Sequence, residues 1–362
     1  MKIGILTHYD VHNHGALLQL NALIQVIKCK GFDVAALTYK KNYDFMAEGI
    51  DKKYDISIRS VLWYLSYMCS IGLKRTIFNV KKKRILDKFR KPLEGEYYSR
   101  AKDLFAVVIG SDEVFSVETG INPFFFGHGI PCDKICSYAA CCGPTTLDSI
   151  KDKNLEGFVH SGLENMKKIS VRDENTKNIV FELTQNTVPV VCDPVILYGY
   201  KDEIRDAENK FNSNYILIYS YDNNMNDDIE VKKIRHFASK NHLKIISAGF
   251  YHKWCDKCVD ASPTELLSYF KNADYVITDT FHGAVMSLIC NSQFVAKLRN
   301  NANKLYDLLS RYGVADRIVN DFDEITGVFS KNIDYSIVNN LIEAHRNESA
   351  KFIDDCLGIK ND

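Results

Sequence analysis

A cluster of polar residues lies where a buried strand gives way to a helix. Tyr275–Thr278 (YVIT) is an aromatic and β-branched run typical of a strand, and the apolar stretch AVMSLIC after Gly283 predicts a helix. Asp279, Thr280 and His282 lie between the two. A helix N-terminus is electropositive and leaves N–H groups unpaired, so a phosphate or carboxylate would bind there beside His282. The pattern also fits an ordinary turn in which the histidine caps the helix or completes a core hydrogen bond.

A second strand end carries two adjacent carboxylates. The run Asp103–Ile109 (DLFAVVI) predicts a buried strand, and Gly110, Ser111, Asp112 and Glu113 follow it. The carboxylates could accept hydrogen bonds from sugar hydroxyls or take part in proton transfer. Capping of a helix by Ser111 or Asp112 is the alternative.

Arg172 follows a third predicted strand, Lys168–Val171. A guanidinium at a strand end suits bidentate binding of a carboxylate or phosphate. An ion pair with Asp173 or Glu174 is the alternative. A further predicted strand, Val188–Asp193, closes this half of the chain.

The first forty residues predict a strand, a capped helix and a second strand. Lys2–Thr7 is the first strand, Asn13 caps a helix that opens near Gly15, and Val34–Tyr39 is the second strand. The glycines do not follow G-x-G-x-x-G, so the dinucleotide-binding fingerprint is absent.

Two groups of residues raise the question of a metal site. His8, His12 and His14 are close in sequence but have no carboxylate or thiol set to complete them. Cys255 and Cys258 form a single CxxC without a second pair. We therefore expect no metal site.

The bulk composition is that of a globular protein. The 362 residues carry 46 basic and 46 acidic side chains, a balance that does not favour nucleic acid as a partner. The eleven cysteines are odd in number and scattered, which fits free thiols in a reducing cytoplasm. The opening MKIGILT begins directly with a strand, so we expect no targeting segment before the fold.

A second α/β half begins at Tyr215–Tyr221, after a polar linker from about Leu197 to Ser213. It continues with a helix over Asp228–Asn241 and a helix capped by Ser262, and it reaches the strand described first. Beyond these come a basic turn and helix that hold Arg299 and Lys304, and a last amphipathic helix over 335–357.

One apolar and one basic segment raise the question of a membrane surface. Val61–Leu73 is apolar but shorter than the about 20 residues that a bilayer span needs. Residues 74–91 are strongly basic. Together, 61–91 could lie on an anionic membrane. A helical hairpin packed on the sheet, with a solvated basic face, is the alternative.

Six segments in order resemble the motifs of the polysaccharide pyruvyl transferase family, up to about Val319. They are NHGALLQLNAL, VVIGSDEVFS, ISVRDENT, VCDPVIL, the stretch from SPTELL to DTFHGAV, and KLYDLLSRYGVADRIV. Glu113, Phe115 and the pair Cys141-Cys142 depart from the residues usual in the family, near the expected acceptor.

The resemblance implies an α/β, GT-B-like fold: two Rossmann-like domains facing a cleft. Residues 1–197 would form the first domain, on the acceptor side, with a helical insertion over 55–92. Residues 213–330 would form the second, on the donor side, and the helix within 331–362 would cross back to the first.

The resemblance also implies an activity. Its members transfer a carboxyethylidene group from phosphoenolpyruvate to two hydroxyls of a saccharide and release phosphate, in surface or capsular polysaccharide biosynthesis. Phosphoenolpyruvate would be a co-substrate, with no other cofactor, and the basic segment fits a lipid-linked acceptor at the inner membrane face. A GT-B glycosyltransferase of the sialyltransferase kind, using a nucleotide sugar, is the alternative, and a non-catalytic carbohydrate- or metal-binding protein is another.

Roles for the residues follow from that reaction. His282 is the expected general acid, and Asp112 is expected to orient or deprotonate an acceptor hydroxyl. The expected donor-binding residues are Arg172, Gly283, Thr280, Arg299, Lys304, Asn13 and Gly15. The expected acceptor-binding residues are Ser111, Glu113 and His14.

Overall fold

The first domain is built on a five-stranded parallel sheet. The computed structural model describes residues 1–40, 72–118, 120–211, 213–299 and 302–359. The sheet has the order β3-β2-β1-β4-β5. Its strands are β1 (Lys2–Leu6), β2 (Asp33–Thr38), β3 (Glu94–Tyr97), β4 (Leu104–Ile109) and β5 (Ile135–Ser137). The apolar runs predicted at β1 and β4 are buried, as a parallel sheet covered on both faces requires.

Two predicted strands of this half are wrong as regular strands. Lys168–Val171 and Val188–Asp193 make only single bridges, at Lys168, Val171 and Val190. Pro189 accepts a bond from the Val171 amide but has no N–H to donate in return. The regular hydrogen bonding between parallel strands therefore does not continue beyond β5.

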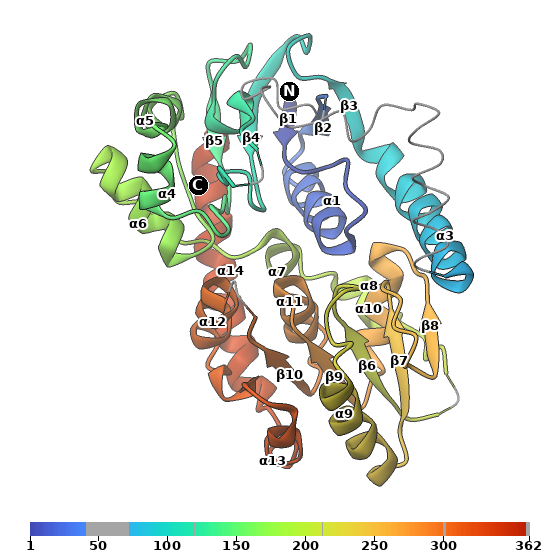
Figure 1. Cartoon of the computed structure of the whole chain (residues 1–362). Coiled ribbons are helices and arrows are strands. Elements are labelled where there is room, and N and C mark those ends of the chain that lie inside the picture. The colour runs from blue at the N-terminus through green and yellow to red at the C-terminus, as the bar shows by residue number, and fades with distance from the viewer. Residues whose placement is uncertain (41–71, 119, 212, 300–301, 360–362) are drawn as a thin grey trace.

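The second domain has a six-stranded parallel sheet in the order β11-β10-β9-β6-β7-β8. Its strands are β6 (Tyr215–Tyr219), β7 (Lys244–Ala248), β8 (Lys257–Val259), β9 (Tyr275–Thr278), β10 (Phe294–Lys297) and β11 (Ile318–Val319). In both sheets the winding direction reverses, between β1 and β4 in the first and between β6 and β9 in the second. Such switch points open a crevice at the carboxyl ends of the strands. The predicted class of two Rossmann-like domains is confirmed (Figure 1).

Helices cover the sheets and join the domains. Those of the first domain are α1 (His14–Lys28), α3 (Leu73–Arg90), α4 (Leu147–Asp152), α5 (Glu156–Glu164) and α6 (Glu174–Thr184). The connection holds α7 (Pro194–Tyr198) and α8 (Lys201–Arg205). The second domain has α9 (Asp228–Lys240), α10 (Pro263–Lys271), α11 (Phe281–Ile289), α12 (Ala302–Arg311), α13 (Ile325–Phe329) and α14 (Tyr335–Leu357). The short 3-10 turns are η2 (Lys91–Leu93), η3 (Pro123–Phe126), η4 (Ala315–Arg317) and η5 (Phe322–Glu324). The predicted helix caps at Asn13 and Ser262 are confirmed.

Helix α1 lies at the junction of the two domains. Leu20 and Leu23 belong to the core of the first domain, whereas Leu18 and Ala22 pack into the core of the second. Such a helix, apolar nearly all round, is buried between layers. The N-terminus of α1 is therefore brought to the boundary where the two sheets face each other (Figure 1).

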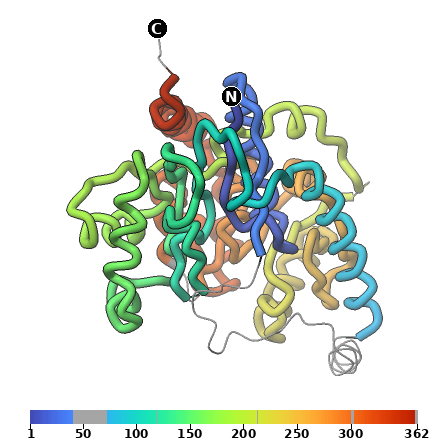
Figure 2. The backbone as a smooth tube through the Cα atoms, turned by 90° about the horizontal axis from the view of Figure 1, so that it is seen from above, coloured from blue at the N-terminus to red at the C-terminus, as the bar shows by residue number. Residues whose placement is uncertain are grey.

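Helix α14 runs from the second domain back along the first. Its early residues Val338 and Ile342 pack in the second core, and its late residues Ile353 and Leu357 pack in the first. The Ser349 hydroxyl accepts a 2.9 Å bond from the Cys192 amide. The helix thus ties the two domains together, as the red trace in Figures 1 and 2 shows.

Helix α3 reaches from the first domain onto the second. Its Lys82 ammonium lies 4.0 Å from the centre of the Phe250 ring, and its Arg75 pairs with Asp222 at 3.4 Å. Most of the apolar segment Val61–Leu73, and the first part of the predicted insertion, lie outside the described residues. Within the described ranges, no helix combines the length and apolar character needed to cross a bilayer.

Candidate active site

A cavity of about 860 Å³ opens between the two domains. It lies at the switch points of both sheets, because most of its polar lining residues follow the carboxyl ends of β1, β4, β6 and β9. The lining residues are His8, Val11, Asn13, Ala16, Asp112, Glu113, Arg172, Tyr221, Asn224, Asp279, Thr280, Phe281, His282, Arg299, Lys304 and Leu305. Eight of the twelve predicted site residues are therefore gathered here.

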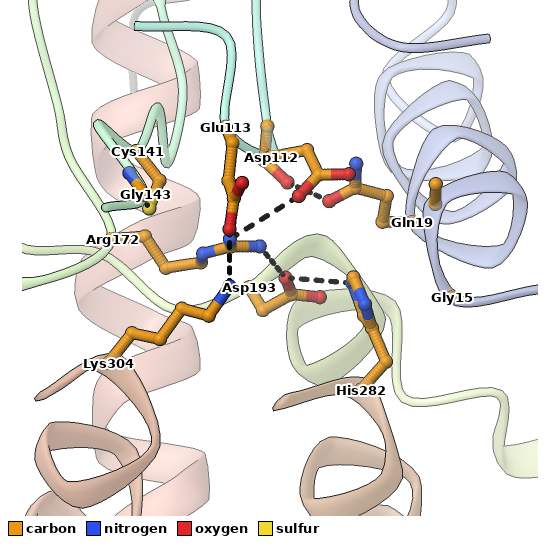
Figure 3. A network of polar contacts seen from close by, with 12 residues as sticks. Gly15, Gln19, Asp112, Glu113, Cys141, Gly143, Arg172, Asp193, His282 and Lys304 are labelled. Carbon is orange, nitrogen blue, oxygen red and sulfur yellow. Dashed lines mark hydrogen bonds and ion pairs between the residues drawn. The ribbon is translucent and has the colours of Figure 1, made fainter. Parts of the chain in front are cut away.

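Arg172 is the central cation of this cavity (Figure 3). Its guanidinium donates to Asp193 at 3.0 Å and pairs with Asp112 at 3.5 Å. The same group lies 4.3 Å from the centre of the Phe281 ring. Its Nε is buried and has no hydrogen-bond partner among the described residues. The arginine is thus fixed in place by two carboxylates and an aromatic face, and its Nε–H has no partner.

Asp112 stays ionised in spite of its burial. Desolvation alone would raise the pKa of the Asp112 carboxyl, but Arg172, helped by His282, His8 and Lys304, lowers the pKa to about 2. Its backbone has φ +82°, a left-handed conformation that is uncommon for a non-glycine residue. The turn after β4 therefore presents a permanent hydrogen-bond acceptor to the cavity.

His282 lies at the start of α11 and faces α1 from the other domain. Its Nε2 is 3.8 Å from Asp193, and this buried atom has no hydrogen-bond partner in the described part of the chain. Burial lowers the pKa of the imidazole, while Asp193 and Asp112 oppose that shift. The ring is therefore mainly neutral near pH 7, and its Nε2 is not committed to another residue of the described chain.

Gly15 leaves the space that the His282 ring occupies. A Cβ atom added to Gly15 would lie 2.2 Å from Cγ and 2.4 Å from Nδ1 of His282. The N-termini of α1 and α11 thus meet edge to edge across the domain boundary. This close approach is possible only where α1 carries no side chain.

Lys304 and Glu113 form an ion pair across the cavity, from α12 of the second domain to the turn after β4 of the first. Burial would lower the pKa of the Lys304 ammonium, but Glu113 raises it above its ordinary value. A Cβ on Gly143 would lie 2.6 Å from Cδ of Glu113. The carboxylate is therefore confined on one side by backbone and held by the lysine on the other.

The two predicted backbone donors, Gly15 and Gly283, are already engaged. The Gly15 amide donates to Oδ1 of Asn13 at 2.9 Å, and the Gly283 amide donates to Oγ1 of Thr280 at 2.9 Å. Neither glycine lines the cavity. The caps Asn13 and Thr280 do line it, so they, rather than the glycine N–H groups, face a ligand.

Arg299 lines the cavity but is committed to its own domain. Its guanidinium binds Glu230 with two bonds of 3.0 and 2.9 Å and donates to Asp279 at 3.1 Å. These bonds leave Arg299 fewer N–H groups for a substrate. Arg172 and Lys304 could each exchange a carboxylate partner for a ligand.

Two predicted acceptor residues lie away from the cavity. The Ser111 hydroxyl is 1% exposed and donates to Gln19 of α1. The His14 ring does not line the cavity; its Nε2 contacts the Ala261 carbonyl at 3.1 Å and Phe250 packs on it. Ser111 therefore fixes α1 within the first domain, and His14 joins α1 to the second domain. Neither residue lines the cavity.

Acidification is expected to weaken the domain junction through His14. Burial, assisted by the positive charge of Lys82, lowers the pKa of His14 to about 3. Since the unfolded histidine titrates near 6.5, stability is full above that pH and falls as the pH drops towards 3, by about 2 kcal/mol at pH 5. Urea unfolding at pH 7 and 5 measures this loss. His14→Gln should flatten the pH dependence, and an unchanged slope would contradict the assignment.

Three residues of the site were missed by sequence reasoning. Asp193 caps α7 and contacts both Arg172 and His282, and His8 and Tyr221 follow β1 and β6. The sequence places Asp193 at a strand end and in the VCDPVIL segment but assigns it no role in the site. His8 and Tyr221 could have been found, because β1 and β6 are the strands at which each Rossmann-like sheet changes direction.

The histidines and cysteines considered for metal binding point to separate partners. The His8 Nε2 contacts the Glu113 carbonyl at 3.3 Å, and His12 pairs with Asp87. The Cys258 thiol donates to the His252 carbonyl at 3.2 Å. Over the ranges that the structure describes, no group of three or more His, Cys, Asp or Glu residues could hold a metal ion.

Comparisons with known proteins agree with this architecture. A family model described as polysaccharide pyruvyl transferase matches residues 13–300. Neisseria meningitidis UDP-GlcNAc 2-epimerase bound to UDP-GlcNAc superposes with a TM-score of 0.52 at 12% identity, over 99% of this chain and 100% of that chain. Staphylococcus aureus MnaA with UDP gives 0.51 at 11% identity, over 100% and 98%. Arabidopsis thaliana UGT89C1 with quercetin gives 0.50 at 9% identity, over 99% and 98%. A search of curated proteins finds no match. At these identities the solved structures show a shared GT-B fold alone.

Proposed function

The chain belongs to the polysaccharide pyruvyl transferase family, and we propose that it transfers a carboxyethylidene group from phosphoenolpyruvate to two hydroxyls of a saccharide and releases phosphate. The observation that carries this proposal is His282. Its Nε2 is buried and unpartnered among the described residues, and the residue lines a cavity that also holds Arg172 and Lys304. A proton donor in the same cavity as two cations is what an anionic enol phosphate requires.

Arg172 and Lys304 are the proposed donor-binding cations. Phosphoenolpyruvate carries a phosphate and a carboxylate, and these two side chains line the cavity together with Thr280 at the N-terminus of α11. In the free protein both cations are paired with carboxylates of the chain. The donor would therefore replace Glu113 on Lys304 and use the free Nε of Arg172.

His282 is the proposed general acid. Its proton adds to the methylene carbon of the donor, so that the C2=C3 electrons form the new C–H bond and C2 becomes oxocarbenium-like. A saccharide hydroxyl adds to C2, phosphate leaves with the C2–O electrons, and a second hydroxyl closes the ketal. One hydroxyl proton restores His282 and the other leaves with phosphate. The bound dianion would raise the pKa of His282 and supply the charged form.

Asp112 is the proposed orienting residue for the acceptor. A carboxylate with a pKa of about 2 is a weak base, so an accepting hydrogen bond to a sugar hydroxyl suits it better than proton abstraction. Asp112 and His282 approach Arg172 from different domains, through the turns after β4 and β9 (Figure 3). A sugar bound between them would have its hydroxyls near the donor C2.

Ligand binding and product analysis together test the proposal. Phosphoenolpyruvate at 100 times its Kd should stabilise the protein by about 2.7 kcal/mol, whereas UDP- and CMP-sugars should not. With labelled phosphoenolpyruvate and aryl or lipid-linked glycosides, label should appear as a ketal in equal amount to released phosphate. Stabilisation by a nucleotide sugar alone would favour a GT-B glycosyltransferase instead, and donor binding without any ketal would indicate a different transfer.

Replacing the two members of the Lys304–Glu113 pair is expected to change the affinity for phosphoenolpyruvate in opposite directions. Lys304→Ala should raise the Kd for phosphoenolpyruvate by about tenfold or more, because a charged hydrogen bond of about 1.5–3 kcal/mol is lost. Glu113→Gln should lower that Kd severalfold, since the lysine is released from its competitor. Calorimetric titration without acceptor measures both. If the two variants weaken binding equally, the pair serves only to hold the domains together.

A further inference from the structure

Helix α3 presents an outward face that no other element of the described chain covers. Leu73, Ile77 and Val80 are 75%, 47% and 45% exposed, although all three are large and apolar. Their spacing of four and three residues places them on one side of the helix. The opposite side, with Phe78, Lys82 and Leu86, is buried against the protein. The helix is therefore anchored on one side and apolar on the other.

Basic residues surround this apolar line. By helical position, Lys74 and Lys81 lie on one flank, Lys83 on the other, and Arg84 and Lys88 continue the line towards the C-terminus. Asp87 is the single acidic residue of α3 and is paired with Lys83. The chain as a whole is neutral, so this is a local excess of positive charge.

The basic surface continues on the second domain. A cavity of about 420 Å³ lies between α3 and the loop before β8, and Lys253 and Lys257 line it together with Lys74 and Lys81. Two carboxylates, Asp256 and Asp260, also line it, and the former is engaged with the Ile245 amide. With four lysines and two carboxylates, the lining of this cavity has a net positive charge. Figure 1 shows α3 at the outer edge of the molecule, beside β8.

We propose that the α3 face docks the protein on an anionic lipid bilayer. An apolar line flanked by lysines matches the interface of a membrane, where the apolar side chains enter the acyl boundary and the lysine stems extend to the headgroups. A nucleic acid would match the charge but not the exposed Leu73 and Ile77. The proposal does not rest on the proposed function, because it uses no residue of the cavity between the domains.

Side-chain contacts join the docked helix to the wall of the cavity between the domains. Lys82, on its buried side, lies over the Phe250 ring, and Phe250 packs on Tyr221 with ring centres 5.4 Å apart. Tyr221 lines the cavity. The docked helix is therefore separated from the cavity by the side chains of Lys82, Phe250 and Tyr221.

Vesicle sedimentation tests the docking. The full chain should sediment with vesicles of phosphatidylcholine and phosphatidylglycerol, less so at high salt, and should remain in solution with phosphatidylcholine alone. Ile77→Glu should reduce the bound fraction at least tenfold, since a charge replaces an apolar side chain that docking would bury in the membrane. Ile229→Glu is the matched control, because Ile229 on α9 is 65% exposed and distant in sequence from α3. It should bind as the unmodified protein does.

Three results would overturn the proposal. They are failure of the unmodified chain to sediment with anionic vesicles, equal binding to the two vesicle types, and equal loss in the Ile77→Glu and Ile229→Glu variants. If Ile77→Glu lowers the melting temperature, the double variant Lys81→Ala, Arg84→Ala replaces it, since both side chains are exposed. That variant should also lose binding to the anionic vesicles at low salt.

Discussion

Replacement of His282 by asparagine is expected to lower kcat by about a hundredfold or more with the fold intact. General acid catalysis by a positioned side chain contributes about 10²–10⁴ in rate. Asparagine keeps a polar group of similar size but has no proton to give. Steady-state phosphate release with saturating donor and acceptor measures the loss, and the Kd for phosphoenolpyruvate should change far less than kcat.

The pH profile separates an acid from a merely structural histidine. If the protonated ring acts, kcat/KM for phosphoenolpyruvate should fall as pH rises through the pKa of the free protein, which burial holds below the usual value. The profile of kcat should fall only at higher pH, because the bound dianion raises the pKa of His282. The His282→Asn variant should lose this limb in its residual activity.

His236→Asn is the matched control for this experiment. His236 is exposed on α9 and does not line the cavity between the domains. Its replacement should leave kcat and both pH profiles unchanged. Near-normal turnover of folded His282→Asn would remove His282 from the mechanism, whatever the family would suggest.

Strand ends such as those of β4 and β9 were predictable because they depend on local sequence. Apolar runs such as Tyr275–Thr278 are observed as strands with the predicted bounds, and the polar residues after them line the cavity. A parallel sheet brings its carboxyl ends to one edge, so Asp112 and His282 could be assigned to strand ends without knowledge of their distance. The predicted caps Asn13 and Ser262 follow from the same local rules.

The remainder of the site depends on contacts between segments far apart in the chain. The side chains of Asn13 and Thr280 accept hydrogen bonds from the N–H groups of Gly15 and Gly283, which the sequence suggested for an anion. The structure therefore shows that the caps compete with an anion for these donors. His14 and Gly15 are neighbours, but one residue of helix turns them by about 100°, so His14 enters the domain junction while Gly15 meets His282. Which of the two would face the cavity is set by the packing of α1 between two cores.

Gly15→Ala is expected to lower kcat by about a hundredfold, close to the effect of removing His282 itself. The new methyl group would lie 2.2 Å from Cγ of His282, so either the ring or the N-terminus of α1 must move. A displacement of about 1 Å is enough to cost about 10² in rate when it takes an acid out of reach of its carbon. The loss should appear in kcat, because Arg172 and Lys304 would still bind the donor.

Helix propensity makes this substitution informative. Alanine is favoured over glycine within a helix by about 0.8–1 kcal/mol, so Gly15→Ala in α1 would stabilise the protein if sterics were absent. Gly157→Ala in α5 is the matched control, since nothing lies within 4 Å of its added Cβ. We expect Gly157→Ala to raise the free energy of unfolding with kcat unchanged, and Gly15→Ala to lower both. Gain of stability with full activity in Gly15→Ala would show that the two helix ends do not meet during turnover. In that case His282 would need another means of positioning, and the contact with Asp193 would have to supply it.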